Sequence, residues 1–351
     1  MVFKNNPAAF NGVTSIQKDN LTNNLLLGVQ DFLSWGFLNV GAFQNISRDP
    51  AVSGSYPDSH SRYRLRICDD PNYEYGSVWE GFRNDWVWES GVGYDGAKPI
   101  NVSGVWVEDN YYKLTDSSFS HFVDYPNGRV IFDYPISDTT KIEANFSHRT
   151  VGVCLASKPF VRELMYDSYD MEDLNTYLIA SSGVRNQTGE TRLQLPFVAL
   201  EIAQGGKSTP YQLGGGRIAE NDILFHIFSD NEFEKNNIRD VILNQNEKVF
   251  YLINRGLMKT EKRRKNYPGC KGHSYPHQLD SNGSPVGSAL MYTDLISPTG
   301  DPSYGMRWKA TRIDKTTCSD MEPVNNWLYR STVRGTFSVI MGVNENIAQV
   351  E

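Results

Sequence analysis

The stretch that decides the fold is LPFVALEI at residues 195–202, followed by RIAENDILFHIF at residues 217–228. Each run has the length of a strand and is rich in β-branched and aromatic residues. From Ile223 to Phe228 the second run is almost entirely apolar, which is typical of a strand covered on both faces. The polar segment SDNE at residues 229–232 then resembles a helix start, with acidic side chains in the first turn. The order strand, strand, helix predicts an α+β layer.

Helical periodicity appears on both sides of this region. The apolar face expected after the SDNE segment consists of Phe233, Ile238, Val241, Ile242 and Val249. Residues 249–253 either extend that helix or begin another segment. Near the start of the chain, Asp19 or Asn20 is placed to cap a helix that runs to about Leu38. Its apolar face consists of Leu21, Leu25, Val29, Phe32, Leu33 and Phe37, so we expect it to pack on a sheet.

Residues 47–153 have the pattern of an all-β domain. Short runs rich in aromatic and β-branched residues alternate there with turn residues, and helical periodicity is absent. The sequence Pro126-Asn127-Gly128 predicts a turn between two strands. We expect strands at residues 63–68, 77–79, 85–88, 102–107, 129–132 and 141–148.

The remainder of the chain predicts a helix edge or strand, a long loop and two late strands. Residues 160–165 suit either a strand or a helix edge, whereas residues 255–303 have little periodicity and suggest a long loop excursion, which in a domain is usually functional. The late strands are expected at residues 306–313 and 327–341, the second as a hairpin kinked at Gly335. The predicted division is residues 1–46 as an arm and helix of the core, residues 47–153 as an inserted all-β domain, and residues 154–351 as the α+β core with its excursion.

Composition favours an ordered protein with little affinity for nucleic acid. The 351 residues carry a net charge of −7, and 39% of them are hydrophobic. Phosphate binding needs clustered Lys and Arg, so an acidic chain suits a surface past which DNA slides without sticking. The four cysteines are widely spaced and contain no CxxC pair, so we expect reduced thiols in a protein that is synthesised in the cytoplasm. No secretory signal or bilayer-spanning run is visible, so we expect no membrane association.

Two glycine-rich motifs have part of the pattern of nucleotide-binding loops. The segment Gly205-Gly206-Lys-Ser-Thr lacks the earlier glycine of a phosphate loop, because Glu201 stands there, and it leads to Pro210 instead of a helix. The run Gly214-Gly215-Gly216 lacks the spacing of a dinucleotide fingerprint. We therefore predict no cofactor, and interpret residues 205–216 as a connecting turn whose glycines permit close subunit contact.

The long excursion contains two further candidate sites. Cys270, His273 and His277 form C-x2-H-x3-H, a set of zinc ligands to which Cys318 would add a fourth. A polar loop without metal is the alternative, and the prediction is no metal site. The basic run Lys262-Arg263-Arg264-Lys265 is either a solvated loop or a contact for DNA phosphates or, preferably, an acidic protein partner.

Aromatic residues are dense in the 47–153 segment and have three readings. They form the core of a small sandwich, a protein interface, or a platform for sugars. The residues are Trp79, Trp86, Trp88, Trp106, Tyr73, Tyr75, Tyr94, Tyr111 and Tyr112. No G-x-S-x-G motif occurs, and the histidines show no local catalytic signature, so we predict that the chain is not an enzyme. An enzyme acting on polysaccharide would need a carboxylate pair that faces a groove.

Several of these segments resemble virion structural proteins of tailed bacteriophages. Residues 123–133, VDYPNGRVIFD, and residues 142–149, IEANFSHR, are similar to stretches of such proteins. Residues 196–201, the glycine-rich turn, residues 225–229 and the helix from Glu232 are similar to the core of tail terminator and neck proteins. The resemblance implies an α+β fold, in which a small sheet with packed helices carries an inserted all-β domain.

The function that this resemblance implies is structural. Tail terminators and neck proteins form a ring, usually sixfold, that caps the tail tube and joins it to the head connector while DNA passes through. The expected partners are further copies of the chain and other phage neck, tail tube or sheath proteins, and the expected location is the virion. Ring closure is heterologous, so sheet edges and the 205–216 turn are the expected contact elements. The alternative is a carbohydrate- or receptor-binding virion module that uses the aromatic β domain.

Overall fold

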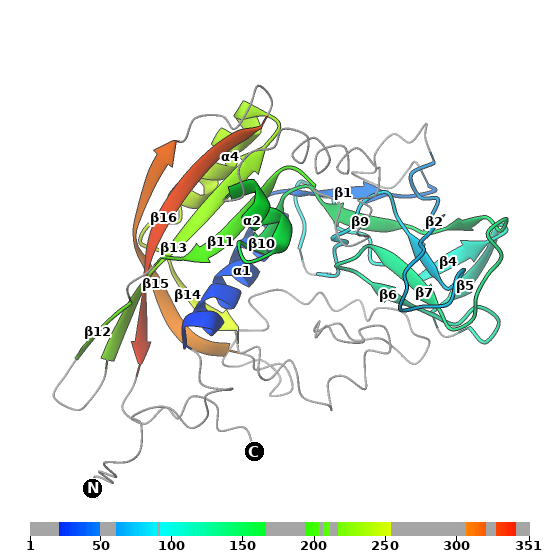
Figure 1. Cartoon of the computed structure of the whole chain (residues 1–351), viewed down its shortest axis with the longest axis horizontal. Helices are drawn as coiled ribbons and strands as arrows, with labels where there is room; N and C mark the ends of the chain where they lie inside the picture. Colours follow the sequence, from blue (N-terminus) through cyan, green and yellow to red (C-terminus); the bar gives the residue numbers. More distant parts are fainter. Residues whose placement is uncertain are drawn as a thin grey trace, which may run out of the picture.

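The computed structural model describes residues 21–49, 61–89, 92–114, 116–165, 194–203, 206–210, 217–253, 307–320 and 328–341. The described chain is mostly β with few helices and is α+β in the broad sense. Figure 1 shows one large curved sheet with helices against it, and a group of smaller sheets to its side. The predicted excursion at residues 255–303 lies outside the described residues.

The large sheet is mixed and has seven strands, so it is not the small sheet that we expected. Strands β10 and β11 pair in parallel, and all its other pairs are antiparallel. In spatial order the strands are β10 (Gly152–Leu155), β11 (Phe197–Ile202), β13 (Arg217–Ser229), β16 (Tyr329–Met341), β15 (Arg307–Asp320) and β14 (Val249–Ile253). The short β12 (Lys207–Pro210) pairs with the first residues of β13, beside the place where β11 ends.

Helix α1 (Leu21–Asn39) confirms the first predicted helix and lies inside the curve of this sheet. It contacts β10 and β11 near one edge of the sheet and β14 at the other. A flat sheet could not bring both edges to one helix, so the sheet curls around α1 as a half-barrel. Leu25, Val29, Leu33 and Phe37 of α1 are buried in this core, and Phe32 stacks on Phe250 of β14 with ring centroids 4.2 Å apart.

Helix α4 (Glu232–Leu243) packs on the middle strands β13, β15 and β16. Its start matches the predicted signal, because the side chain of Asn231 accepts a hydrogen bond from the Phe233 backbone N–H at 2.9 Å. The predicted face was wrong at Phe233, which is 80% exposed. Phe233 lies five residues before buried Ile238, about 140° away around a helix with 3.6 residues per turn. Val249 was also wrongly placed on the helix, because it begins the edge strand β14.

A second core covers the opposite face of the sheet at one end. Helix α2 (Pro159–Met165) places Val161 and Leu164 against Phe197 and Phe228. The neighbouring residues of β11 and β13 point into the half-barrel, so at Phe197 and Phe228 these strands are buried on both faces. The prediction of a strand covered on both faces therefore holds for the Phe228 end of the run from residue 223 to residue 228, whereas Leu224 and His226 point to the other side of the sheet without an apolar cover from the described residues.

The two late strands differ from the prediction in different ways, because β15 extends to Asp320, beyond the predicted end at residue 313, whereas β16 stays within the predicted range 327–341. Strand β16 is a single strand rather than a hairpin, and it pairs with β13 on one side and β15 on the other. Gly335 lies in its middle, opposite Ile223 and Thr316. A Cβ at this glycine would lie 2.9 Å from Cε2 of Phe337 and 3.1 Å from Cε2 of Phe225. The glycine is required for close packing and does not mark a kink.

The glycine-rich segment at residues 205–216 is not only a turn, because it contains strand β12. Ser208 and Thr209 pair with Ala219 and Ile218, which extends the sheet beyond the end of β11. Figure 1 shows β12 and the adjoining ends of β13 and β16 projecting away from the helices.

The smaller sheets share a core that includes one end of α1. Trp35 and Leu38 of the helix join buried aromatic and β-branched residues of these sheets, among them Trp86 and Phe146, whose rings stack at 4.2 Å. The strands are β1 (Phe43–Ile46), β2 (Arg66–Ile67), β3 (Val78–Glu80), β4 (Gly104–Val107), β5 (Asn110–Lys113), β6 (His121–Asp124), β7 (Arg129–Phe132), β8 (Ile142–Glu143) and β9 (Phe146–Arg149). The division into a core and an inserted domain stays a prediction.

Two sequence signals in this part had different outcomes. The predicted turn at Pro126-Asn127-Gly128 does connect β6 to β7, with Gly128 at a φ of +61°. The strand predicted at residues 141–148 is instead two strands, because β8 pairs with β4 whereas β9 pairs with β1.

Candidate functional site

The outer face of the large sheet, opposite α1 and α4, is polar over most of its length. Successive residues of a strand point to opposite faces, so Val333, Phe337 and Val339 enter the half-barrel while the residues between them point outward. The outward residues are Asp222, Leu224 and His226 of β13, Arg330, Thr332, Arg334, Thr336 and Ser338 of β16, and Arg312, Lys315 and Thr317 of β15. We call this set the polar face.

Cross-strand hydrogen bonds hold the centre of the polar face. The Thr336 hydroxyl donates to Asp222 Oδ1 at 2.7 Å, and Arg334 Nε donates to Asp222 Oδ2 at 3.0 Å. Burial alone would raise the pKa of Asp222, but the hydrogen bonds from Thr336 and Arg334 outweigh it and lower the pKa. Asp222 therefore stays ionised, and its hydrogen bonds with Thr336 and Arg334 link β13 to β16.

His226 occupies the most buried polar position on this face. Its Nε2 lies 3.1 Å from Glu201 Oε2 and its Nδ1 lies 3.1 Å from the Thr332 hydroxyl. A carboxylate only accepts, so Nε2 carries the proton and Nδ1 accepts from Thr332. Burial lowers the pKa of His226, while the Glu201 hydrogen bond opposes that effect. The three residues lie on neighbouring strands, and their contacts satisfy both ring nitrogens of His226. A structural role in holding the strands together therefore explains the presence of these residues.

The projecting end of the sheet contains the described part of the predicted contact segment. Gly206 and most of β12 are exposed, and a Cβ at Gly206 would lie 2.6 Å from Asn221 Oδ1. Among the described strands, β12 pairs only with β13, so its other edge presents backbone donors and acceptors. The other predicted contact glycines, Gly205, Gly214, Gly215 and Gly216, lie outside the described residues.

The remaining predicted site residues cannot be placed in the fold. The basic run Lys262, Arg263, Arg264 and Lys265 and the candidate ligands Cys270, His273 and His277 all lie outside the described residues. Cys318 lies on β15 with its sulfur 3.6 Å from the Ser331 hydroxyl. The described residues contain no group of three or more His, Cys, Asp or Glu side chains positioned to hold a metal ion.

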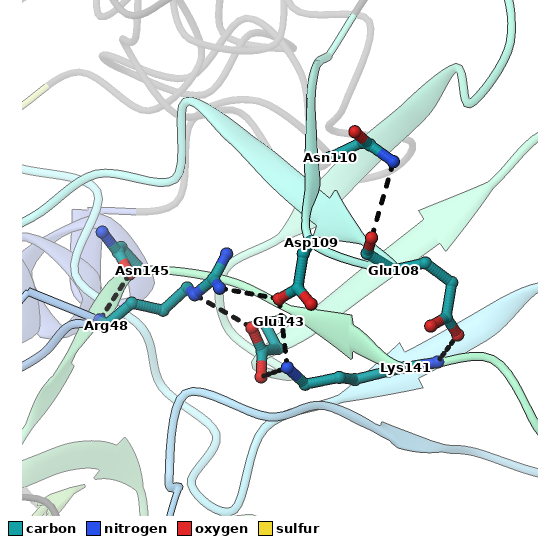
Figure 2. Close-up of polar contacts among 7 residues, drawn as sticks. All are labelled: Arg48, Glu108, Asp109, Asn110, Lys141, Glu143 and Asn145. Carbon is teal, nitrogen blue, oxygen red and sulfur yellow. Dashed lines mark hydrogen bonds and ion pairs between the residues drawn. The ribbon is translucent and has the colours of Figure 1, made fainter.

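A second charged cluster, which sequence reasoning missed, lies in the small sheets (Figure 2). Arg48 bridges Asp109 at 2.8 Å and Glu143 at 2.9 Å, and Lys141 Nζ contacts the same two carboxylates at 3.1 and 3.0 Å. The Glu143 side chain is only 3% exposed. The Arg48 guanidinium also lies 5.1 Å from the centre of the Trp106 ring.

The charges of this cluster are matched, two cations against two carboxylates. The hydrogen bond from Lys141 to Asp109 is the main reason that the pKa of Asp109 is lowered. The hydrogen bond from Lys141 to Glu143 is the main reason that the pKa of Lys141 is raised. Lys141 and Glu143 are two residues apart in the sequence, but the other three pairs are 32 to 95 residues apart, so only the fold brings the whole cluster together. We interpret the cluster as a connection between the β1 and β8 segments.

The aromatic residues of the small sheets divide into buried tryptophans and exposed tyrosines. Trp79, Trp86 and Trp88 are buried, which confirms the core interpretation for them. In contrast, Tyr73, Tyr75, Tyr94, Tyr111 and Tyr134 are exposed. Tyr75 and Tyr134 are 56% and 74% exposed, on two loops that a hydrogen bond from the Ile136 N–H to the Gly76 carbonyl holds together.

Comparison with known proteins found no family model that matches this chain and no curated protein with significant sequence similarity. Within the described residues, no helix combines the length and the apolar character needed to cross a lipid bilayer.

Proposed function

We propose that this chain is a structural subunit of a ring that joins the head of a tailed bacteriophage to its tail. In this role it caps the tail tube as a terminator or forms part of the neck, and genomic DNA passes through the ring. The observation that carries the proposal is the large sheet, with its long strands, its polar outer face and its projecting edge.

The length of the central strands supports a role in assembly. Strands β13, β15 and β16 have 13, 14 and 13 residues, more than twice the usual five or six. At about 3.3 Å per residue each of them is about 40 Å long. Such strands form a stiff surface that reaches beyond the helices, and that extra length is not needed to enclose the core.

The polar face and the β12 edge suit a head-to-tail contact. Such a contact joins two different surfaces of neighbouring copies and closes into a ring when the rotation per copy divides a full turn. The edge of β12 supplies backbone hydrogen bonds, and the polar face supplies hydroxyl and charged partners. The net charge of −7 suits a ring whose channel must not retain DNA.

Negative-stain microscopy and mass measurement by light scattering test the proposal on the purified full chain. We expect rings with a central hole and a mass near six times 39.7 kDa. Lys315→Glu reverses one exposed charge on the polar face, and Lys113→Glu makes the same change on β5 as the matched control. The Lys315 variant should lose the ring, whereas the control should keep it.

Two results would contradict these assignments separately. A chain that stays monomeric, alone and with purified neck or tail tube proteins, refutes the ring. A ring that survives Lys315→Glu as well as Lys113→Glu places the contact elsewhere than the polar face.

The second candidate function is a carbohydrate- or receptor-binding virion module, which the exposed tyrosines favour. Tyr75 and Tyr134 present aromatic rings on adjoining loops, as stacking on a sugar requires. A glycan array separates the two functions, because binding that Tyr75→Ala and Tyr134→Ala abolish would support the module, and a blank array would remove it.

A further inference from the structure

A groove of about 620 Å³ opens on the small sheets, away from the polar face. Its lining includes most of the segment Ser61–Ile67, which crosses from β8 to β3, together with Asp138 and Thr140 of the loop before β8. Trp79 and Phe82 also line it. The groove is thus lined by a turn with the extended residues that follow it, and by a loop.

Three arginines line this groove, all from one wall. Arg62, Arg64 and Arg66 alternate along the segment, and Arg64 and Arg66 are exposed. Arg62 lies in the turn that the Arg64 N–H closes by donating to the Ser61 carbonyl oxygen, whereas Arg64 and Arg66 lie in the extended part that pairs with β8 and β3. Extended residues two apart are about 6.6 Å apart, so the charges of Arg64 and Arg66 are offset by that interval. The nearby acids are Glu80 and Glu143, opposite Arg66 and Arg64 in the strand register, and Asp138 in the lining. Glu143 is already paired with Arg48 and Lys141. The lining carries a net positive charge.

One further cation, Arg83, lies near this wall. The Arg62 guanidinium lies 5.5 Å from the centre of the Phe82 ring, whose edge meets the ring of His148. Burial is the main reason that the pKa of His148 is lowered to about 4, and the charges of Arg83 and Arg62 act in the same direction. Burial is the main reason that the pKa of Arg83 is lowered, and the charge of Arg62 acts in the same direction. Arg62 and Arg83 repel each other, while Asp230 acts on Arg83 in the opposite direction, and an anion in the groove would add to that compensation.

We propose that this groove binds an extended acidic segment of a partner protein, with carboxylates at alternate positions along its chain. Alternate side chains of an extended peptide share one face and repeat at the same interval as Arg64 and Arg66. Arginine presents a planar fork that matches a carboxylate. Thr140 can donate to such a segment, and Asp138 can accept one of its backbone N–H groups.

The lining favours a peptide over a single-stranded nucleic acid. Base binding needs an open aromatic face, but Trp79 is 3% exposed and Phe82 is already covered by Arg62. Asp138 would repel a continuous row of phosphates, and so would a chain with a net charge of −7. The inference does not depend on ring formation, because the groove lies within one chain.

Fluorescence anisotropy on the full chain tests the proposal with three labelled probes. They are a peptide of alternating Glu and Thr, the same peptide with Lys in place of Glu, and an oligothymidine of similar length. We expect only the alternating acidic peptide to bind, and its affinity should weaken as salt rises from 50 to 300 mM. Equal or tighter binding of the oligothymidine would overturn the peptide assignment, and no binding of any probe would overturn the site.

Three exposed substitutions locate the binding. Arg64→Glu should weaken the acidic peptide about tenfold, because it replaces an attraction with a repulsion. Asp138→Asn keeps a carbonyl acceptor and removes a negative charge, so it should tighten binding about threefold. Lys113→Glu, with the same charge change on β5, should have no effect. If Lys113→Glu weakens binding as much as Arg64→Glu, the attraction is diffuse and the groove is not the site.

Discussion

His148 should make the stability of this protein fall steeply in mild acid. The imidazole is buried where β9 faces residue 86, and its Nδ1 lies 3.0 Å from the Arg149 carbonyl oxygen, to which it must donate. Phe82 covers the ring edge-on at 5.4 Å. In this place a second proton would leave a charged imidazolium almost without water, near the cations Arg62 and Arg83.

The magnitude follows from the pKa of His148, which burial lowers from 6.5 to about 4. Between these two values the unfolded chain binds a proton that the folded chain does not, so the free energy of unfolding falls as the pH falls. The loss is about 2 kcal/mol between pH 7 and pH 5, and about 3 kcal/mol at pH 4. Stability from this source is complete above pH 6.5.

Urea unfolding of the wild type and of His148→Gln at pH 7, 6, 5 and 4 measures this loss. Glutamine keeps a donor for the Arg149 carbonyl but does not titrate. The pKa of Glu89, raised by burial, acts in the opposite direction as pH falls, but it does so in both proteins and cancels in the comparison. We expect the wild type to lose about 2 kcal/mol more than the variant between pH 7 and pH 5. Equal slopes would refute the reasoning.

Two further predictions concern the buried ion pair and helix α1. Arg149→Met leaves the Glu89 carboxylate, which is 2% exposed, without its cation, so the free energy of unfolding in urea at pH 7 should fall by about 3–5 kcal/mol. The double variant with Arg149→Met and Glu89→Leu should recover most of that loss. A double variant as unstable as the single one would contradict this. Gly28→Ala should lower the melting temperature, because the added Cβ would lie 2.6 Å from Leu252 Cδ2. Gly36→Ala has open space around the added Cβ and should stabilise the protein by up to about 1 kcal/mol. A change of the same sign in both variants would refute the packing argument.

The elements that the sequence predicted best are those with local signals. Helix α1 followed from an apolar stripe, the start of α4 from the SDNE segment at residues 229–232, and the turn before β7 from Pro126-Asn127-Gly128. Strand partners are not local, so the change of partner between β8 and β9 and the pairing of β12 left no sequence signal. Gly335 shows the same limit, because a glycine required for packing and a glycine required for a turn look alike in a sequence.

The candidate sites were harder to predict than the fold. His226 lies 25 residues from Glu201 and 106 from Thr332, and only the register of three strands brings them together. The groove is different, because Arg62, Arg64 and Arg66 form a visible alternation of like charges in the sequence. The alternation indicates one face of an extended segment, which holds for Arg64 and Arg66, but Arg62 lies in a turn, and the sequence does not show whether that face is open. The place of Asp138 in the lining comes from the fold alone.

Helix α1 links the two surfaces to which we assign functions. Leu25 and Leu33 bury one part of it in the half-barrel, while Trp35 and Leu38 belong to the core of the small sheets. Arg149 adds a polar connection, because its guanidinium reaches the Ser34 carbonyl oxygen as well as Glu89. One rigid helix shared by two cores holds both sheets in a defined orientation. In a ring built through the polar face, every copy would therefore present its arginine groove at the same angle, so acidic segments of one partner could be bound at regular positions around the ring.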